Sequence, residues 1–197
     1  MSRTIRTAAV LLSAALVAAG ATACSSTAGS SVATAPKAGA AAGGDATSSA
    51  PKKDQQPQKK ADAKVGDTIS LKGMDTKADV TVLKVVDNPK GADEFTTPES
   101  GKRFVSVQFR IRNTGSKAYN DTPSNGAKIL DTEGQGFDSS LSDTAAGPAF
   151  PADVTIAPGG TAKGFITFEV PKAAKLDKLQ FGLDSGFADQ TGQWNLR

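Results

Sequence analysis

Histidine is absent from this chain of 197 residues, and cysteine, tryptophan and tyrosine occur once each. Without histidine, the chain lacks the usual general base of serine and cysteine nucleophiles and a common ligand of zinc. A single cysteine also excludes a disulfide within the chain. Carboxylates, hydroxyls and lysines are the groups that remain for chemistry. We therefore expect a protein that is not an enzyme and that carries no metal or other cofactor.

Long apolar runs are absent as well. The longest, from Ala8 to Ala23, is rich in alanine and shorter than the roughly 20 strongly apolar residues that span a membrane. It follows Arg3 and Arg6 and ends in small residues, which is the order found in an export signal. Residues 1–23 are therefore predicted to be a signal peptide that is removed by cleavage.

Cys24 comes directly after Ala21-Thr22-Ala23, and these four residues resemble the lipobox of bacterial lipoproteins, with alanine at position 21 where leucine is most common. The resemblance implies that the Cys24 sulfur carries a diacylglyceryl group, with fatty acyl chains such as palmitate. Two acyl chains anchor a protein stably to a bilayer. The mature protein is then expected at the outer face of the cell membrane. In the alternative, the leader is a plain secretory signal and Cys24 remains a free thiol.

Large apolar side chains are missing from the segment that follows, because residues 25–64 contain no Leu, Ile, Phe, Trp or Tyr. Such a segment cannot offset the entropy lost on ordering, so residues 24–64 are predicted to be a disordered tether rich in Ala, Ser, Pro and Lys. Its six lysines against three aspartates could bind anionic headgroups or acidic wall polymers. The alternative is a solubilising spacer. As a flexible coil, a tether of this length has a reach of about 35 Å.

All nine phenylalanines, together with Tyr119 and Trp194, lie in residues 65–197, which are predicted to form one globular domain. Its 133 residues are enough to bury a core without disulfides. Its 15 basic and 17 acidic residues give a net charge of −2, so the basic character of the whole chain comes from the leader and the tether. The domain therefore has no electrostatic basis for binding nucleic acid.

Alternation of apolar and polar residues is the dominant pattern in this domain. It predicts a half-buried antiparallel strand over residues 103–113, with four residues facing the core: Val105, Val107, Phe109 and Ile111. In residues 80–86 both parities are apolar, which indicates a bulge or cover on both faces. Only residues 171–178 have helical composition. Further strands are predicted at 68–71, 127–130, 136–137, 154–156, 164–170, 179–183 and, as an edge, 193–196. Seven or eight short strands predict an all-β fold, an antiparallel sandwich.

Several turn and core segments are similar to those of the telokin-like extracellular domain of unknown function that is common in lipoproteins of Gram-positive bacteria. This domain is related in fold to the mycobacterial immunoprotective antigen. The resemblance implies an immunoglobulin-like β-sandwich and supplies no catalytic residues. It covers most of residues 65–197 and rests on these segments: Gly66-Asp67, 104–107, 112–115, 130–134, 156–159 and 164–171.

Three aromatic residues in predicted connections are candidates for contact with a ligand: Phe95, Tyr119 and Phe150. The long connections at 87–101 and 134–152 are of the kind on which functional surfaces lie. For Phe95 and Tyr119 the alternative is packing onto the sandwich.

Two groups of carboxylates could carry chemistry. The run 131–138 contains three carboxylates that suggest Ca²⁺, but its glycine stands at the fourth position instead of the sixth, so we expect a hairpin turn and no metal site. Asp93, Glu94 and Glu99 lie in one loop and could serve a hydrolase that uses paired carboxylates. The alternative for these acids is a solvated loop.

Together these features predict a lipid-anchored, non-enzymatic binding or interaction module of the cell surface. Its expected partners are the membrane, through the lipid on Cys24, and a cell-surface protein or wall polymer. The alternative is a structural accessory subunit that docks to a membrane or cell-wall complex. A carboxylate-dependent hydrolase is the least favoured of the three functions.

Overall fold

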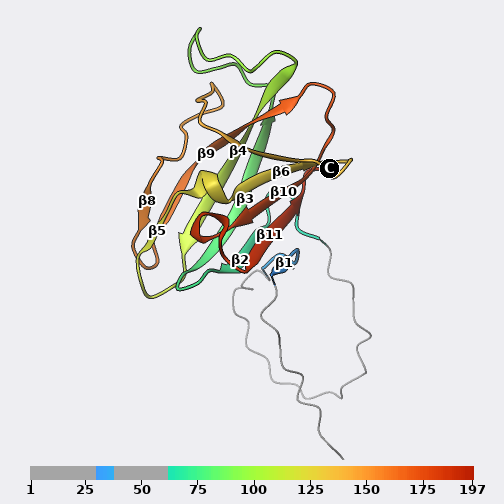
Figure 1. The fold of residues 1–197 in the computed structure, drawn as a ribbon. Helices are drawn as coiled ribbons and strands as arrows, with labels where there is room; N and C mark the ends of the chain where they lie inside the picture. Colours follow the sequence, from blue (N-terminus) through green and yellow to red (C-terminus); the bar gives the residue numbers. More distant parts are fainter. Residues whose placement is uncertain (1–29, 38–61) are drawn as a thin grey trace, which may run out of the picture.

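The computed structural model describes residues 30–37 and 62–197, and this part of the chain is all-β (Figure 1). Two short 3-10 turns, η1 (Pro123–Gly126) and η2 (Asp184–Gly186), interrupt the strands. No helix in the described residues is long and apolar enough to cross a membrane. The all-β prediction is confirmed, but eleven strands exceed the seven or eight expected. They are β1 (Ser31–Ala33), β2 (Thr68–Lys72), β3 (Lys77–Asp87), β4 (Lys102–Asn113), β5 (Tyr119–Asp121), β6 (Ala127–Asp131), β7 (Gly136–Ser140), β8 (Val154–Ile156), β9 (Thr161–Pro171), β10 (Leu176–Gly182) and β11 (Gln190–Asn195).

Nine strands form one sheet in the order β1-β11-β10-β6-β7-β9-β4-β3-β2, and β5 and β8 form a separate two-stranded ribbon. All pairs are antiparallel except β1 and β11, which run parallel. β7 joins the two halves of the sheet, because it pairs with β6 through Lys128 to Leu130 and with β9 through Ser139 and Ser140. The sheet therefore winds around a single core and is nearly closed into a barrel.

The core is formed by the inward residues of the alternating strands. In β4 the four residues expected to face inward are fully buried, as predicted. In β3 the register shifts between Val82 and Lys84, which confirms the bulge that the mixed parity indicated. The rings of Phe109 and Phe181 meet across the core from β4 and β10, with 5.2 Å between centroids. The largest buried side chains include Trp194, Tyr119, Phe104, Phe109, Phe168, Phe181, Ile111, Ile129 and Leu179.

Hydrogen bonds made by two side chains of β11 link this strand to the residues at either end of β2, so the two ends of the sheet meet. The indole Nε1 of Trp194 in β11 donates to the carbonyl of Asp67, just before β2, at 3.0 Å. The backbone N–H of Lys72 donates to the side-chain oxygen of Gln190 at 2.7 Å. β1 pairs with residues 190–192 of β11, and the N–H of Asn195 donates to the carbonyl of Ala63 at 2.8 Å, so the strand predicted as an edge at 193–196 is covered on that side.

Residues 30–37 pack on the domain, which corrects the prediction of disorder for this part of the tether. β1 pairs with residues 190–192 of β11, and the N–H of Ser31 donates to the carbonyl of Asp189 at 2.7 Å. Further along, the N–H of Lys37 donates to the carbonyl of Thr68 at 2.7 Å. These contacts use backbone groups, so the composition of the segment gives no sign of them. The predicted signal peptide, Cys24 and residues 38–61 lie outside the described residues.

Residues 171–178 form a turn and the start of β10, so the helix that their composition favoured is absent. The N–H of Ala174 donates to the carbonyl of Pro171 at 3.0 Å, and β10 begins at Leu176. The guanidinium of Arg103 donates to the carbonyls of Pro171, Lys172 and Ala174 at 2.6 to 3.1 Å. These carbonyls thus find their partner in β4, and a tertiary contact overrides the local helical preference.

Candidate binding surface

Two long loops meet at one end of the barrel. One connects β3 to β4 over residues 88–101 and reaches the top of Figure 1 in green; the other connects β7 to β8 over residues 141–153. The N–H of Ala92 donates to the carbonyl of Asp143 at 3.0 Å, and the N–H of Ala145 donates to that of Lys90 at 2.9 Å. The two loops are therefore tied into one surface, which we call the loop end.

Within the loop end, Asp93 builds the turn that holds Phe95 outward. One oxygen of its carboxylate accepts hydrogen bonds from the N–H of Phe95 at 3.0 Å and from both the N–H and the hydroxyl of Thr96 at 2.8 Å. The hydroxyl and N–H of Thr96, with the N–H of Phe95, hold the pKa of Asp93 below its ordinary value. A Cβ on Gly91 would lie 1.8 Å from the carbonyl oxygen of Thr96, so only glycine fits there. Phe95 is consequently held in solvent with 85% of its surface exposed.

The second loop is fastened to the outer face of the sheet by buried hydroxyls. The hydroxyl of Thr144 lies 2.8 Å from that of Ser106 in β4, which in turn lies 3.1 Å from that of Thr167 in β9. Leu141, at the start of the loop, is 94% exposed. The sequence alone does not mark Leu141 because its neighbours show no alternation that would assign it to a face.

The loop end is acidic. Residues 88–101 and 141–153 contain five carboxylates and one lysine, a net charge of −4. Of these acids, Glu99 forms an ion pair at 2.6 Å with Lys102, the first residue of β4. The surface therefore combines exposed apolar side chains with negative charge, which is the composition expected to favour a partner that carries apolar and basic groups.

Phe150, a predicted ligand residue, lies at the edge of this surface and is half-buried against the core. Its backbone approaches β9 so closely that a Cβ on Gly164 would lie 2.6 Å from the Phe150 nitrogen. Phe150 and Leu141 both line a shallow cavity of about 190 Å³. Phe150 thus belongs to the second loop and packs against the core, while Phe95 is exposed on the first loop.

Tyr119, the third predicted ligand residue, lies in the core, so its assignment to a ligand surface is wrong. It is fully buried in β5, and its hydroxyl donates to the carboxylate of Asp121 at 2.8 Å. Burial, reinforced by the charge of Asp121, raises the pKa of the Tyr119 phenol above its ordinary value. Alternation over three residues is too short to show which way a side chain points. Cys24, the predicted lipidation site, lies outside the described residues.

The carboxylates considered for metal or hydrolytic chemistry do not form a cluster. Asp131 accepts hydrogen bonds from the N–H groups of Glu133 and Gln135 at 2.9 and 2.8 Å and so stabilises the hairpin turn between β6 and β7. Asp138 pairs with Lys128 at 3.0 Å. Within residues 30–37 and 62–197, no three cysteine or acidic residues gather closely enough to hold a metal ion.

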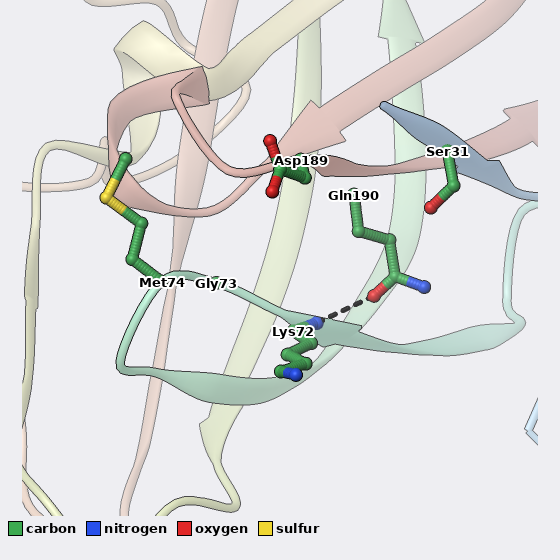
Figure 2. A pocket seen from close by; sticks show the side chains of 6 residues that line it. All are labelled: Ser31, Lys72, Gly73, Met74, Asp189 and Gln190. Atoms are coloured by element: carbon green, nitrogen blue, oxygen red, sulfur yellow. Dashed lines mark hydrogen bonds between the residues drawn. The ribbon is translucent and has the colours of Figure 1, made fainter. Parts of the chain in front are cut away.

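A second set of exposed apolar residues lies at the opposite end of the barrel, where the sequence predicts no site. Met74, in the turn between β2 and β3, is 69% exposed, and Phe187, between η2 and β11, is 77% exposed. Each is an isolated apolar residue among glycine, serine and aspartate, a context in which periodicity carries no signal. A polar cavity lies beside Met74 and is shown in Figure 2.

The fold and these surfaces define an all-β domain whose four most exposed large apolar residues lie at its two ends: Phe95, Leu141, Met74 and Phe187. Residues 63–191 match the model of a family described as a domain of unknown function (DUF4352), and the chain belongs to that family. None of the curated proteins compared with the chain matches it.

Three solved structures are similar to the chain. The secreted protein MPT63 of Mycobacterium tuberculosis is 15% identical with a TM-score of 0.49, over 68% of this chain and 95% of MPT63. The yjhA protein of Bacillus subtilis gives the same identity and score over 68% of this chain and 99% of its own. The ycdA protein of Bacillus subtilis, provisionally described as a lipoprotein, is 16% identical with a TM-score of 0.48; the matched part spans 64% of this chain but 37% of ycdA.

Proposed function

We propose that this chain is a lipid-anchored extracytoplasmic protein whose immunoglobulin-like domain binds a partner, without catalysis, through the loop end. The observation that carries the proposal is the turn around Asp93, in which three hydrogen bonds to one carboxylate oxygen keep Phe95 in solvent. An aromatic side chain held in place before binding contributes large contact area at a low entropic cost. Exposure of an aromatic ring to water does not stabilise the fold, so the stability of the fold does not explain the position of Phe95.

The anchoring part of the proposal is supported by the sequence, in which Cys24 follows a leader of the export type. The non-catalytic part is supported by the state of the loop acids. Asp93, with a lowered pKa, is ionised at neutral pH and cannot donate a proton, and Glu99 is paired with Lys102. A hydrolase acting through paired carboxylates would need one acid with a raised pKa.

The test is photo-crosslinking in intact cells that express the full chain. Benzoylphenylalanine replaces Phe95 in one variant and Lys163 in the control; Lys163 is exposed at the start of β9, among the strands. We expect a defined adduct from position 95 that is absent from position 163. An adduct with a subunit of a membrane or wall complex would favour the accessory-subunit function. Identical adducts from both positions, or none from position 95, would contradict binding through the loop end.

A further inference from the structure

At the end of the barrel opposite the loop end, two exposed apolar side chains, Met74 and Phe187, lie on turns that hydrogen bonds hold in place. We call this the Met74 end. The N–H of Met74 donates to the carboxylate of Asp184 at 2.6 Å, and the N–H of Phe187 donates to the carbonyl of the same residue at 3.0 Å. The hydroxyl of Thr76 also donates to the Asp184 carboxylate, at 3.1 Å. One aspartate thus ties the two turns together and holds both Met74 and Phe187 outward.

The N-terminal part of the chain reaches the domain at this same end. Ser31, the first residue of β1, lines a polar cavity of about 360 Å³ together with Met74, and the other lining residues are Lys72, Gly73, Asp189 and Gln190 (Figure 2). Ser31 is seven residues after Cys24. A fully extended chain of that length spans at most about 25 Å. The docking of β1 therefore places Met74 near any anchor on Cys24.

Distance and charge both set the loop end apart from the anchor. β3 runs from the Met74 turn to the Phe95 loop, and its 11 residues correspond to about 35 Å of strand. Charge at the Met74 end is balanced, since three lysines stand against three aspartates: Lys72, Lys77, Lys117, Asp75, Asp184 and Asp189. The loop end, with its net charge of −4, is repelled by the anionic surface of a bilayer.

From this arrangement we infer that the Met74 end rests on the bilayer, with Met74 and Phe187 inserted at the level of the lipid headgroups. The inference rests on the anchoring proposed for Cys24. Apolar and aromatic side chains favour this interfacial layer, and charge balance makes their insertion independent of anionic lipid. Because the lipid on Cys24 holds the end close to the bilayer, a weak contact is sufficient to orient the domain. The loop end then faces away from the membrane.

The test uses the mature full-length protein, reconstituted into phosphatidylcholine vesicles whose acyl chains carry bromine, which quenches tryptophan on contact. Tryptophan replaces Met74 or Phe187 in the test variants and Phe95 or Leu141 in the controls; all four positions are exposed, so the fold tolerates the change. Trp194 is fully buried and adds a constant background in every variant. We expect at least about two-fold quenching of the added tryptophan at 74 and 187, and none at 95 or 141.

Acylation and vesicle flotation are measured on the same preparations, by mass spectrometry and in a density gradient. Protein that is acylated and floats, yet shows no quenching at 74 and 187 or equal quenching at 95, overturns this orientation and leaves the anchor intact. Protein that carries no acyl group and does not float overturns the anchor and, with it, the orientation. Replacement of phosphatidylcholine by phosphatidylglycerol is expected to leave quenching at 187 unchanged within about 20%, because the end is neutral.

Discussion

Lys37 and Asp79, 42 positions apart in the sequence, form an ion pair in which Nζ and Oδ2 lie 2.5 Å apart. Asp79 belongs to β3 and is almost fully buried, and its other carboxylate oxygen accepts a hydrogen bond from Ser70 at 2.6 Å. Burial alone would raise the pKa of Asp79, but the bonds from Lys37 and Ser70 and the charges of Lys37 and Arg112 outweigh it and lower the pKa. The pair therefore fastens the N-terminal segment to the barrel.

Replacement of Lys37 by methionine is expected to release residues 30–37, because Asp79 then loses its only ammonium partner among the described residues. Hydrogen exchange should report this at the N–H groups of Ser31 and Lys37, which donate to the carbonyls of Asp189 and Thr68. We expect exchange about ten times faster, equivalent to ~1.4 kcal/mol. The control, Lys163→Met, changes an exposed lysine of β9. Equal exchange in both variants would show that the ion pair does not hold the segment.

The same pair predicts a pH dependence with a definite sign. The pKa of Asp79 in the folded protein lies below its ordinary value of 3.8, so the stabilisation is fully present above pH 3.8. It is lost as the pH falls through the lowered pKa, where Asp79 becomes protonated. The free energy of unfolding in urea, measured from pH 5 to pH 2.5, should therefore differ between wild type and Lys37→Met at pH 5 and converge towards pH 2.5. A difference that stays constant with pH would contradict this assignment.

The aromatic contact across the core predicts the largest effect on stability. Phe181 meets Phe109 with 5.2 Å between ring centroids, and both rings are fully buried. Phe181→Ala should lower the free energy of unfolding by about 3 to 5 kcal/mol, through lost burial and the cavity that remains. Phe95→Ala, at 85% exposure, should change it by less than about 0.5 kcal/mol. Urea titration of the two variants checks both values, and similar losses would contradict the placement of Phe95 in solvent.

Sequence patterning predicts the strands that alternate and misses the contacts that backbone groups make. β4 could be predicted because a single core face repeats every second residue. β1 could not, because pairing with a sheet edge requires N–H and C=O groups that every residue carries. Tyr119 was misplaced for a related reason, since β5 is only three residues long. The loop end was predicted only in part: loop length and the aromatic Phe95 are visible in the sequence, whereas the bonds between residues 90–92 and 143–145 are not.

The loop end predicts a contrast between two neighbouring acids. Asp93→Ala removes the three hydrogen bonds that hold Phe95 and Thr96, so the N–H groups of both residues should exchange at least about ten times faster. Glu94→Ala is the matched control, because the Glu94 side chain makes no hydrogen bond or ion pair within the described part of the chain. If crosslinking from position 95 depends on the turn, it should weaken in Asp93→Ala and persist in Glu94→Ala. The reverse result would remove Asp93 from the binding surface.

In a parental protein that carries Met74→Ser and Phe187→Ser, two exposed positions whose change removes the proposed contact with the bilayer, the docked N-terminal segment predicts that the position of an insertion decides how far the domain stands from the membrane. Eighteen Gly/Ser residues inserted after Ser25 lie between Cys24 and β1, and they increase the r.m.s. reach of the seven-residue link between Cys24 and Ser31 by about 13 Å. The same insertion after Gly44 lies between Lys37 and Ala63, which are both fixed to the domain, so it should add nothing.

Energy transfer to a lipid-surface dye, from a fluorophore on Ser142→Cys at the loop end, measures this distance. When Cys24 is acylated, the new thiol is the only free one, because the chain has no other cysteine. Transfer should fall with the insertion after Ser25 and remain at the parental value with the insertion after Gly44. A tether that was free from Cys24 to residue 64 would respond equally to both insertions, so equal responses would show that β1 is undocked in the anchored protein. Unequal responses would require β1 to be docked, because only a fixed point between the two insertion sites can distinguish them.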